Sequence, residues 1–478
     1  MSSSVYDQYR PTIGIECHVQ LATNTKLFSA SDNDARDKAP NTCVNEIDFG
    51  LPGMLPVLNK KAVELAVKAG IALSAEIAPI SRFDRKHYFY PDLPKGYQTS
   101  QLYHPIIGSG KINVPLPNDE SFEVRINHAH LEEDAGKLTH YGGYSLVDLN
   151  RAGTPLIEIV SEPDIHSAEE AKAYAQELYL LMTYAGVTLG DLYHGNMRFD
   201  VNISVAKKEA EKLGTRAEIK NLNSFKSVER VVEYEFKRQV GLVENNEKVI
   251  QETRGWDEAK QKTFTQRSKE DAQDYRYMPD PDIPPIILDN NFIEEMNSTM
   301  PLLPPEYRDK WHSLELDNSV VIALLGDKKI AELVTEVINE SSNAIAKRVA
   351  NLYASAADST AENQSLLDSL RLIELAQMLE SGKLNSTAGK GIFNDMLNGN
   401  DASPSDIANK KGLLQENDES AIIEIVEKVL ADEASRKAVA DIKAGNDKAI
   451  GFLVGLVMKE SRGKANPGLA QKLIKERL

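Results

Sequence analysis

Apolar and polar residues alternate along the stretch 12–21, and the stretches 122–132 and 155–162 are further strand candidates. Alternation with a period of two is typical of a β-strand that buries one face. In the first stretch, Glu16, His18 and Gln20 share one face, and the residues between them are apolar or cysteine. We therefore expect a strand with a core face and an opposite face of polar groups that can carry chemistry.

A helical period of apolar residues follows at 60–74, 168–185 and 224–241. Ser167 and Glu170 have the spacing of a capping box, which marks the start of the second helix. From about residue 291 the periodicity is helical, as in 331–354. The pattern therefore predicts an α+β region followed by two all-α modules.

Two stretches that disfavour regular structure divide these regions. PDPDIPPII at 279–287 is dense in proline, which lacks a backbone donor and stops a helix. NGNDASPSD at 398–406 is a second break rich in turn residues. We expect three domains, at 1–290, 291–400 and 401–478.

The composition supports a folded chain with an acidic surface. Of the 478 residues, 41% are hydrophobic, 72 are acidic and 55 are basic, which gives a formal net charge of −17. This balance excludes a protein that coats nucleic acid nonspecifically, because such binding needs clustered Lys and Arg. It leaves a local contact open, since residues 451–478 hold six basic and two acidic side chains. That end is either an RNA-docking surface or an ordinary charged helix terminus.

The cysteine count and the apolar runs point to a reduced compartment. Cys17 and Cys43 cannot form a disulfide framework, and the chain has no CxxC pair for zinc. The first residues lack the apolar core of a signal peptide. No apolar run reaches the roughly 18 residues that a membrane span needs. We expect a cytoplasmic protein that does not insert into a membrane.

The usual phosphate-binding loops are absent from the sequence. Gly389-Lys390 and Gly463-Lys464 lack the upstream glycine and the following hydroxyl of a Walker motif, and Gly108-Ser-Gly110 lacks the third glycine of a dinucleotide loop. Any ATP chemistry is therefore expected to use carboxylates that bridge a metal to the phosphates.

Acidic side chains on the three predicted strands are the candidates for that metal. His18 and Glu16 lie on the first strand, Glu132 and Glu133 end the second, and Glu158 interrupts an apolar run on the third. A carboxylate in an apolar strand is costly to bury unless it is paired or binds a metal. The alternative is structural: Glu158 pairs with Arg151 or a lysine, and His18 is an interior histidine.

A second candidate surface is the stretch 81–101, in which basic and aromatic residues alternate with Gly and Pro. Such a loop can bind phosphate, stack on a base or hold a charged substrate. It can equally be a surface loop whose rings pack inward. Its candidate binding residues are Arg82, Asp84, Arg85, Lys86 and Tyr88.

Several long strings resemble one known family in its own order. HLEEDAGK at 130–137, YFYPDLPKGYQ at 88–98, LVDLNRAGTPLIEIVSEPD at 146–164 and GFLVGLVMKESRGKANP at 451–467 are similar to the B subunits of aspartyl/glutamyl-tRNA amidotransferase, GatB. The resemblance covers the chain from about residue 13 to its last residues. It implies an antiparallel-sheet cradle related to glutamine synthetase and guanidino kinases, then a helical domain and a YqeY-like tail domain.

The resemblance also implies a reaction and its participants. The carboxylate of Glu-tRNA(Gln) or Asp-tRNA(Asn) is phosphorylated with ATP, and ammonia then replaces the phosphate. The implied partners are subunits A and C of the complex, of which the first is the glutaminase that makes the ammonia and the second ties the complex together.

The site residues are carried over by motif. The implied Mg²⁺ ligands are Glu16, His18, Glu132, Glu133 and Glu158, with Asp200 and Glu218 as candidates for a second metal or an ammonia contact. Glu16, His18, Glu132 and Glu158 are the expected catalytic residues. The expected tRNA contacts are Lys459, Arg462, Lys464 and Lys472.

One departure from the family pattern concerns zinc. Many members carry a CxxC pair where this chain has Asn45 and Asp48, so we expect no zinc here. Two other interpretations remain open at this point: a protein that only positions tRNA within the complex, and a free-standing metal-dependent ligase or hydrolase for small molecules.

Overall fold

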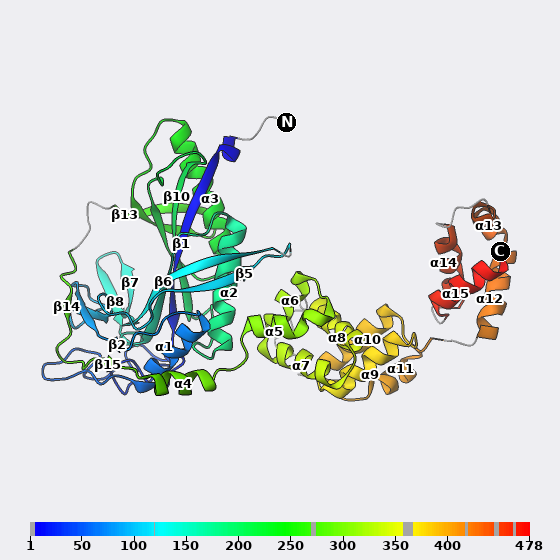
Figure 1. Cartoon of the computed structure of the whole chain (residues 1–478), viewed down its shortest axis with the longest axis horizontal. Coiled ribbons are helices and arrows are strands. Elements are labelled where there is room, and N and C mark those ends of the chain that lie inside the picture. Colours follow the sequence, from blue (N-terminus) through cyan, green and yellow to red (C-terminus); the bar gives the residue numbers. More distant parts are fainter. Residues whose placement is uncertain are drawn as a thin grey trace. The chain divides into compact units, whose positions relative to one another are not determined.

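The computed structural model describes residues 5–118, 120–268, 274–356, 367–415, 419–443, 449–461 and 465–478. Contacts within the chain divide it into two compact units, Met1–Pro304 and Pro305–Leu478. In the residues described, the first unit mixes sheet and helix and the second is helical (Figure 1). The predicted α+β class, with helices following the sheet region, is confirmed.

The first unit is built on an eight-stranded sheet in the order β13-β12-β11-β10-β1-β9-β6-β5. The N-terminal strand β1 lies near its centre, between β10 and β9. In chain order the strands are β1 (Tyr9–Gln20), β5 (Gly110–Pro115), β6 (Ser121–Glu133), β9 (Pro155–Ser161), β10 (Met197–Lys207), β11 (Ala217–Leu222), β12 (Glu252–Asp257) and β13 (Lys262–Ser268).

The expectation of an antiparallel sheet needs one correction. All neighbouring pairs in this sheet are antiparallel except β11 and β12, which run parallel with Glu218 opposite Thr253. Helix α3 (Phe225–Glu244) lies between these two strands in the chain. Parallel neighbours need a long crossover, and this helix provides it. The sheet is therefore mixed.

One face of the sheet forms the core. Ile13, Ile15, Cys17 and Val19 of β1 are buried there, as the alternation predicts. Helices α2 (Ala168–Tyr184) and α3 lie along this face (Figure 1), and α1 (Lys60–Ala72) joins the same core. Each helix begins at a side-chain cap, in which an Asn or Ser oxygen accepts a backbone N–H of the first turn; the caps are Asn59, Ser167 and Ser224. The opposite face is left for polar side chains.

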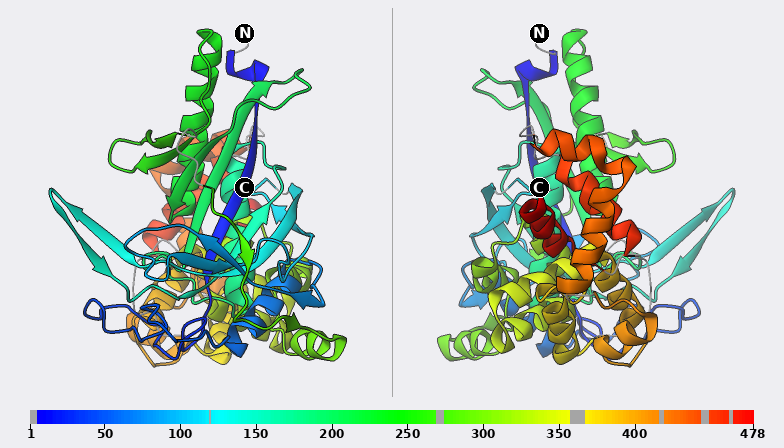
Figure 2. Two further views of the ribbon diagram at one scale, coloured as in Figure 1. Left: turned by 90° about the vertical axis from the view of Figure 1, so that its left-hand side faces the viewer. Right: turned by 90° about the vertical axis from the view of Figure 1, so that its right-hand side faces the viewer.

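Small sheets and a hairpin complete the first unit. They are the three-stranded sheet β14 (Met278–Pro279), β3 (Asp84–His87) and β4 (Tyr97–Ser100), the pair β15 (Ile286–Ile287) and β2 (Ile80–Ser81), and the hairpin β7 (Lys137–Tyr141) and β8 (Tyr144–Asp148). The hairpin, teal in Figure 2, stands out from the rest of the unit as an arm. It connects β6 to β9, two of the strands that hold predicted site carboxylates.

The boundary between the units lies further along the chain than the proline-dense stretch. That stretch pairs with β3 and β2 through β14 and β15, so it belongs to the first unit. Helix α4 (Asn290–Ser298) also belongs there, and its Met296 is part of the core that contains α1. The division by contacts falls after Pro304, and the domain bounds 1–290 and 291–400 stay a prediction.

The second unit is built from short helices, many of which start at an Asp, Asn or Ser cap. The second predicted break, 398–406, covers the link between α10 (Ser386–Leu397) and α11 (Pro404–Lys411) and the first residues of α11, and the division of this unit into two modules stays a prediction. No helix among the described residues could cross a membrane. The helices are α5 (Pro304–Trp311), α6 (Asn318–Leu325), α7 (Lys328–Glu340), α8 (Asn343–Ala356), α9 (Ser369–Glu380), α10 (Ser386–Leu397), α11 (Pro404–Lys411), α12 (Glu419–Ala431), α13 (Arg436–Lys443), α14 (Ile450–Glu460) and α15 (Pro467–Arg477).

Candidate metal centre

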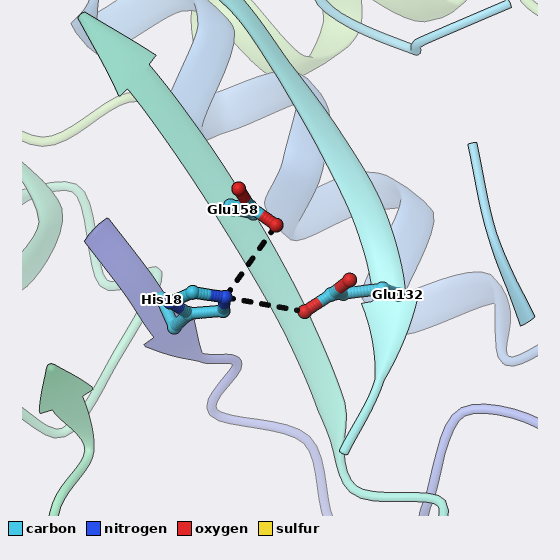
Figure 3. A group of neighbouring side chains, drawn as sticks. All are labelled: His18, Glu132 and Glu158. Atoms are coloured by element: carbon cyan, nitrogen blue, oxygen red, sulfur yellow. Dashed lines mark ion pairs between the residues drawn. The ribbon is translucent and has the colours of Figure 1, made fainter. Parts of the chain in front are cut away.

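Three neighbouring strands bring His18, Glu132 and Glu158 together on the polar face of the sheet (Figure 3). His18 on β1 is directly opposite Glu158 on β9, and Glu132 comes from β6 on the other side of β9. His18 Nε2 lies 3.5 Å from Glu132 Oε1 and 3.4 Å from Glu158 Oε2. The strand register brings these side chains together, because residues paired across neighbouring strands lie on the same face of the sheet.

The charges in this group attract a positive partner. Burial lowers the pKa of His18, but the contact with Glu158 and the charge of Glu132 outweigh it and raise that pKa to about 9. Burial raises the pKa of Glu158, while His130 and His18 lower it well below its usual value. Glu158 thus stays ionised in a partly buried site, and the raised pKa of His18 places a positive charge beside it.

His130 is a further member of the site that we did not assign a role from the sequence. It is directly opposite Glu158, and its Nε2 lies 3.4 Å from Glu158 Oε2 and 3.7 Å from Glu132 Oε2. Its ring stacks on His128, with 5.3 Å between ring centroids. Burial lowers the pKa of His130, but the two carboxylates raise it to about 10. The sequence contains an indication of this position, because residues 128, 130 and 132 are two apart along β6 and therefore share one face of the strand.

The donor set fits a divalent cation. One imidazole nitrogen and two carboxylate oxygens lie within 4.8 Å of one another. Hard carboxylate ligands with a single imidazole suit Mg²⁺ or Mn²⁺. The alternative pairing of Glu158 with Arg151 does not occur, because the Arg151 guanidinium lies 3.3 Å from Asp134 and donates to backbone carbonyls.

A second acidic group, Glu16, Asp200 and Glu218, lies on the adjoining strands β1, β10 and β11. It already contains a cation: Lys220 Nζ lies 3.1 Å from Asp200 and 2.8 Å from Glu218. Asn202 donates to Glu16 at 2.9 Å. Burial and the charge of Glu158 raise the pKa of Glu16. Lys220 is thus already a cationic partner of two of the three carboxylates in this group.

Glu133 lies apart from the His18 group although it follows Glu132 directly. Consecutive strand residues point to opposite faces, and the Glu133 carboxylate accepts from Lys95 Nζ and, at 2.9 Å, from the Thr99 backbone N–H. The structure therefore places Glu133 in a buried ion pair behind the sheet face that carries Glu132.

The basic and aromatic loop divides into structural and site-facing residues. Buried Asp84 accepts the backbone N–H groups of Leu102 and Tyr103. Arg85 pairs with two aspartates of the proline-dense stretch, Asp280 and Asp282. Arg82 is exposed. Asp84 and Arg85 therefore stabilise the loop, and Arg82 is exposed to solvent.

Two residues of the same loop face the acidic group. Lys86 Nζ lies 4.9 Å above the ring of Tyr275. Burial lowers the pKa of Lys86, but the charges of Glu132 and Glu158 raise it overall. Burial and several acidic neighbours raise the pKa of Tyr88. Lys86 therefore supplies positive charge on the site side of the loop.

A cavity of 650 Å³ begins at the end of β1. It is lined by Gln20, Asn24, Arg36, Arg151 and His194, among others. Gln20, which lines the cavity, lies two residues beyond His18 on the same face of the strand, although His18, Glu132 and Glu158 do not themselves line it. Its volume is in the range of small-molecule sites.

The basic residues near the end of the chain are described only in part. Lys459 is in the last turn of α14, and Lys472 on α15 lies 3.7 Å from Glu476. Arg462 and Lys464 lie outside the described residues.

Comparison with known proteins identifies the family. The family model described as the GatB/GatE catalytic domain matches residues 11–294, and the one described as the GatB domain matches 332–478. The B subunit of aspartyl/glutamyl-tRNA(Asn/Gln) amidotransferase from Persephonella marina is 44% identical over 98% of this chain and 100% of its own length. The proteins of the same name from Alkalilimnicola ehrlichii and Thermotoga maritima are 46% and 43% identical, each over 98% of this chain and 99% of their own length. The chain therefore belongs to the GatB family, the B subunits of aspartyl/glutamyl-tRNA(Asn/Gln) amidotransferase.

Proposed function

We propose that this chain activates and amidates the side-chain carboxylate of Glu-tRNA(Gln), Asp-tRNA(Asn) or both. The observation that carries the proposal is the group His18, Glu132 and Glu158 on the polar face of the sheet. The family match supports the same reaction, because the relatives are named as subunits of an aspartyl/glutamyl-tRNA(Asn/Gln) amidotransferase.

The chemistry needs two displacements. A carboxylate oxygen of the aminoacyl side chain attacks the γ-phosphorus of ATP, the bond to the bridging oxygen breaks, and ADP leaves. Ammonia then attacks the carbonyl carbon of the acyl phosphate, loses a proton and expels inorganic phosphate, which leaves the amide. Activation is needed because a free carboxylate has no good leaving group at neutral pH.

The residues of the site fit the first displacement. Phosphoryl transfer depends mainly on positioning and on balancing the charge of the phosphates. His18, Glu132 and Glu158 would hold a Mg²⁺ ion, which when bound supplies positive charge to the phosphate oxygens. Lys86 adds a fixed positive charge beside Glu132 and Glu158. This arrangement requires no glycine-rich phosphate loop, in agreement with its absence from the sequence.

The adjoining cavity is the proposed place for the rest of a substrate. Its 650 Å³ and its mixed polar lining suit the part of ATP that does not react. We further propose that the sheet is a cradle of the kind found in glutamine synthetase and guanidino kinases, and that the helical modules position tRNA. Lys459 and Lys472, with Arg462 and Lys464, are the proposed tRNA contacts.

The proposed partners are subunits A and C of a cytoplasmic complex, of which the first is the glutaminase that makes the ammonia. A protein that only positions tRNA is the competing interpretation. It predicts that His18→Ala and Glu132→Ala lower the melting temperature but leave activity per folded molecule intact. Our proposal predicts instead that both variants stay folded and lose activity.

The test is conversion of Glu-tRNA(Gln) and Asp-tRNA(Asn) by the chain reconstituted with subunits A and C. Conversion should need ATP and Mg²⁺, and Glu158→Gln should lower the rate by about a hundredfold or more. Glu162→Gln, one residue after β9, is the matched control and should keep the wild-type rate. If the wild type converts neither tRNA, the proposal is wrong; if Glu158→Gln matches the wild type, the site assignment alone is wrong.

A further inference from the structure

A second pocket, of 470 Å³, lies on the β11–β13 side of the sheet. Its lining comes from β11, β12, β13 and the start of α3. Lys220 is part of this lining and also contacts Asp200 and Glu218 of the second acidic group. Glu16 of that group lies two residues from His18, on the same face of β1. The pocket therefore adjoins the polar face that carries the candidate metal centre.

An exposed aromatic ring forms one wall of this pocket. Phe264 on β13 is 46% exposed and lies directly opposite Gly255 on β12. A Cβ atom at Gly255 would lie 2.5 Å from the Phe264 ring and 2.5 Å from Gln266 Nε2, so both side chains cover the glycine. A larger residue at 255 would push the ring aside. Among the described residues, no other ring stacks on Phe264, so the ring is available to a ligand.

Trp256 forms a second aromatic wall, and its ring is fixed in place. Its Nε1 donates to Glu258 Oε2 at 2.6 Å, and the same oxygen accepts from Ser227 Oγ at 3.0 Å. The Trp256 ring also packs edge to face on Tyr234, with 6.1 Å between the ring centroids. A ring that is already ordered lowers the entropic cost of binding a ligand.

The other groups of the pocket favour a neutral heterocycle over an anion. Among the described lining residues, Lys220 is the one cation and Glu258 the one acid, and both are already in ion pairs. A phosphate needs a cation that is not already neutralised. The remaining polar side chains include exposed amides, which pair with the adjacent donor and acceptor on the edge of adenine. These amides belong to Asn221, Asn223 and Gln266.

The reaction proposed above uses two molecules that carry an adenosine. One is ATP, whose unreacting part we place in the cavity at the end of β1. The other is the aminoacyl-tRNA, in which the amino acid is esterified to the ribose of the 3′-terminal adenosine. That base is unpaired and is therefore free to stack on a protein ring. Since both molecules must reach the polar face together, a second adenosine needs a second pocket.

The position of the pocket fits the aminoacyl-tRNA. Gly255, under the Phe264 ring, is on β12, and His18 is on β1. These two strands are three strand spacings apart, which is about 14 Å. A ribose, an ester and a glutamyl side chain in series span a distance of this order, because together they contain about ten bonds. A base bound in the pocket therefore leaves its amino acid able to extend toward the candidate metal centre.

We propose that this pocket binds an adenosine, that of the 3′ end of the aminoacyl-tRNA, with its base stacked on Phe264 and beside Trp256. The inference rests on the proposed function, which supplies the substrate. ATP carries the same adenosine chemistry and is the competing source.

The test is a double-mutant cycle on binding. The full chain, reconstituted with the other two subunits, is titrated against fluorescently labelled tRNA(Gln) with and without its terminal adenosine. In the wild type, removal of this adenosine should weaken binding by about tenfold, a usual effect for one stacked base. In Phe264→Ala the same removal should weaken binding by less than about threefold, because the ring that the base contacts is gone.

Two controls and a second variant accompany this cycle. Tyr141→Ala removes a ring of similar exposure from the hairpin, and it should leave the effect of the terminal adenosine as in the wild type. Phe264→Tyr keeps a ring and should do the same. Gly255→Ala should displace the ring without removing it and should behave as Phe264→Ala. Circular dichroism checks that each variant is folded, and Gly255→Ala serves if Phe264→Ala is not.

The competing source is tested by equilibrium dialysis with ATP, for which Phe264→Ala should match the wild type within about twofold. The proposal is overturned if the terminal adenosine has the same effect in the wild type and in Phe264→Ala, or if Phe264→Ala weakens the binding of ATP instead. These titrations need no turnover. A wild type that converts neither aminoacyl-tRNA therefore counts against the proposed function and not against the adenosine pocket.

Discussion

His130 and Glu158 are directly opposed on β6 and β9, with His130 Nε2 3.4 Å from Glu158 Oε2. Glu158 therefore has an imidazole on each side, because His18 approaches the same oxygen from β1 at 3.4 Å. Two basic neighbours hold the carboxylate in one orientation. In metal sites, such supporting contacts commonly change affinity by tenfold to a hundredfold.

We expect His130→Gln to weaken Mn²⁺ binding by about tenfold, because Glu158 and Glu132 lose a neighbour that orients them. Isothermal titration of the full chain with MnCl₂ measures the change. His128→Gln is the control, since His128 stacks on His130 while its Nδ1 lies 2.7 Å from Asn127 Oδ1. Equal affinities in the two variants would show that His130 does not support the site.

Glu132 and Glu133 should differ sharply in metal binding although they are adjacent. Glu132→Gln should weaken Mn²⁺ binding at least about tenfold, whereas Glu133→Gln should leave it nearly unchanged because its carboxylate is paired with Lys95. Glu133→Gln should instead lower the free energy of unfolding by about 3 kcal/mol, as a broken buried pair does. Titration with MnCl₂ and urea denaturation separate the two effects. Loss of metal affinity in Glu133→Gln would contradict the assignment.

Lys220→Met should leave Glu16, Asp200 and Glu218 without their cation. Since the Lys220 side chain is 38% exposed, water screens the interaction, and we expect a loss of only about 0.5–1 kcal/mol in the free energy of unfolding. Millimolar MgCl₂ should raise the melting temperature of this variant more than that of the wild type. Lys226→Met, at an exposed position on α3, should show neither effect. The idea fails if Mg²⁺ stabilises both variants equally.

Glu235 on α3 should make stability depend on acid pH. The carboxylate is fully buried, and burial raises its pKa, but Arg238 and other donors outweigh burial and lower that pKa overall. A lowered pKa contributes stability that is present above the unfolded value of about 4.3 and is lost as the pH falls toward the folded value. Glu235→Gln should cost about 3 kcal/mol at pH 7 and less at pH 3.

Urea denaturation at several pH values measures this difference, with exposed Glu233→Gln as the control on the same helix. A destabilisation by Glu235→Gln that stays constant from pH 7 to pH 3 would argue against an ionised Glu235 in the folded chain.

The sequence predicted the features that depend on local periodicity. Alternation predicted the two faces of β1, and the Ser167–Glu170 spacing predicted the start of α2, where Ser167 Oγ accepts the Glu170 N–H at 3.0 Å. His18, Glu132 and Glu158 were identified because a charged group in an apolar strand demands a partner. The family resemblance named these three residues together with Glu16 and Glu133, and the strand register brings the three together.

What the sequence missed depends on which strands become neighbours. Lys220 was not predicted to balance Asp200 and Glu218, because β10 and β11 pair through a register that includes an irregularity at Phe199–Val201. The parallel pairing of β11 and β12 was also missed, because local periodicity does not show which strands become neighbours. Glu133 could have been separated from Glu132 by alternation alone. The pairing of Glu133 with Lys95, which lies 38 residues away, could not be predicted from the sequence.

The central position of β1 has a consequence for synthesis on the ribosome. β1 is made before both of its partners, β9 and β10, which end at Ser161 and Lys207. At about 5–20 residues per second, the strand waits roughly ten to forty seconds for its second neighbour. During that time its apolar side has no sheet to join, so the nascent chain should require a holding chaperone more than a chain whose early strands form a hairpin.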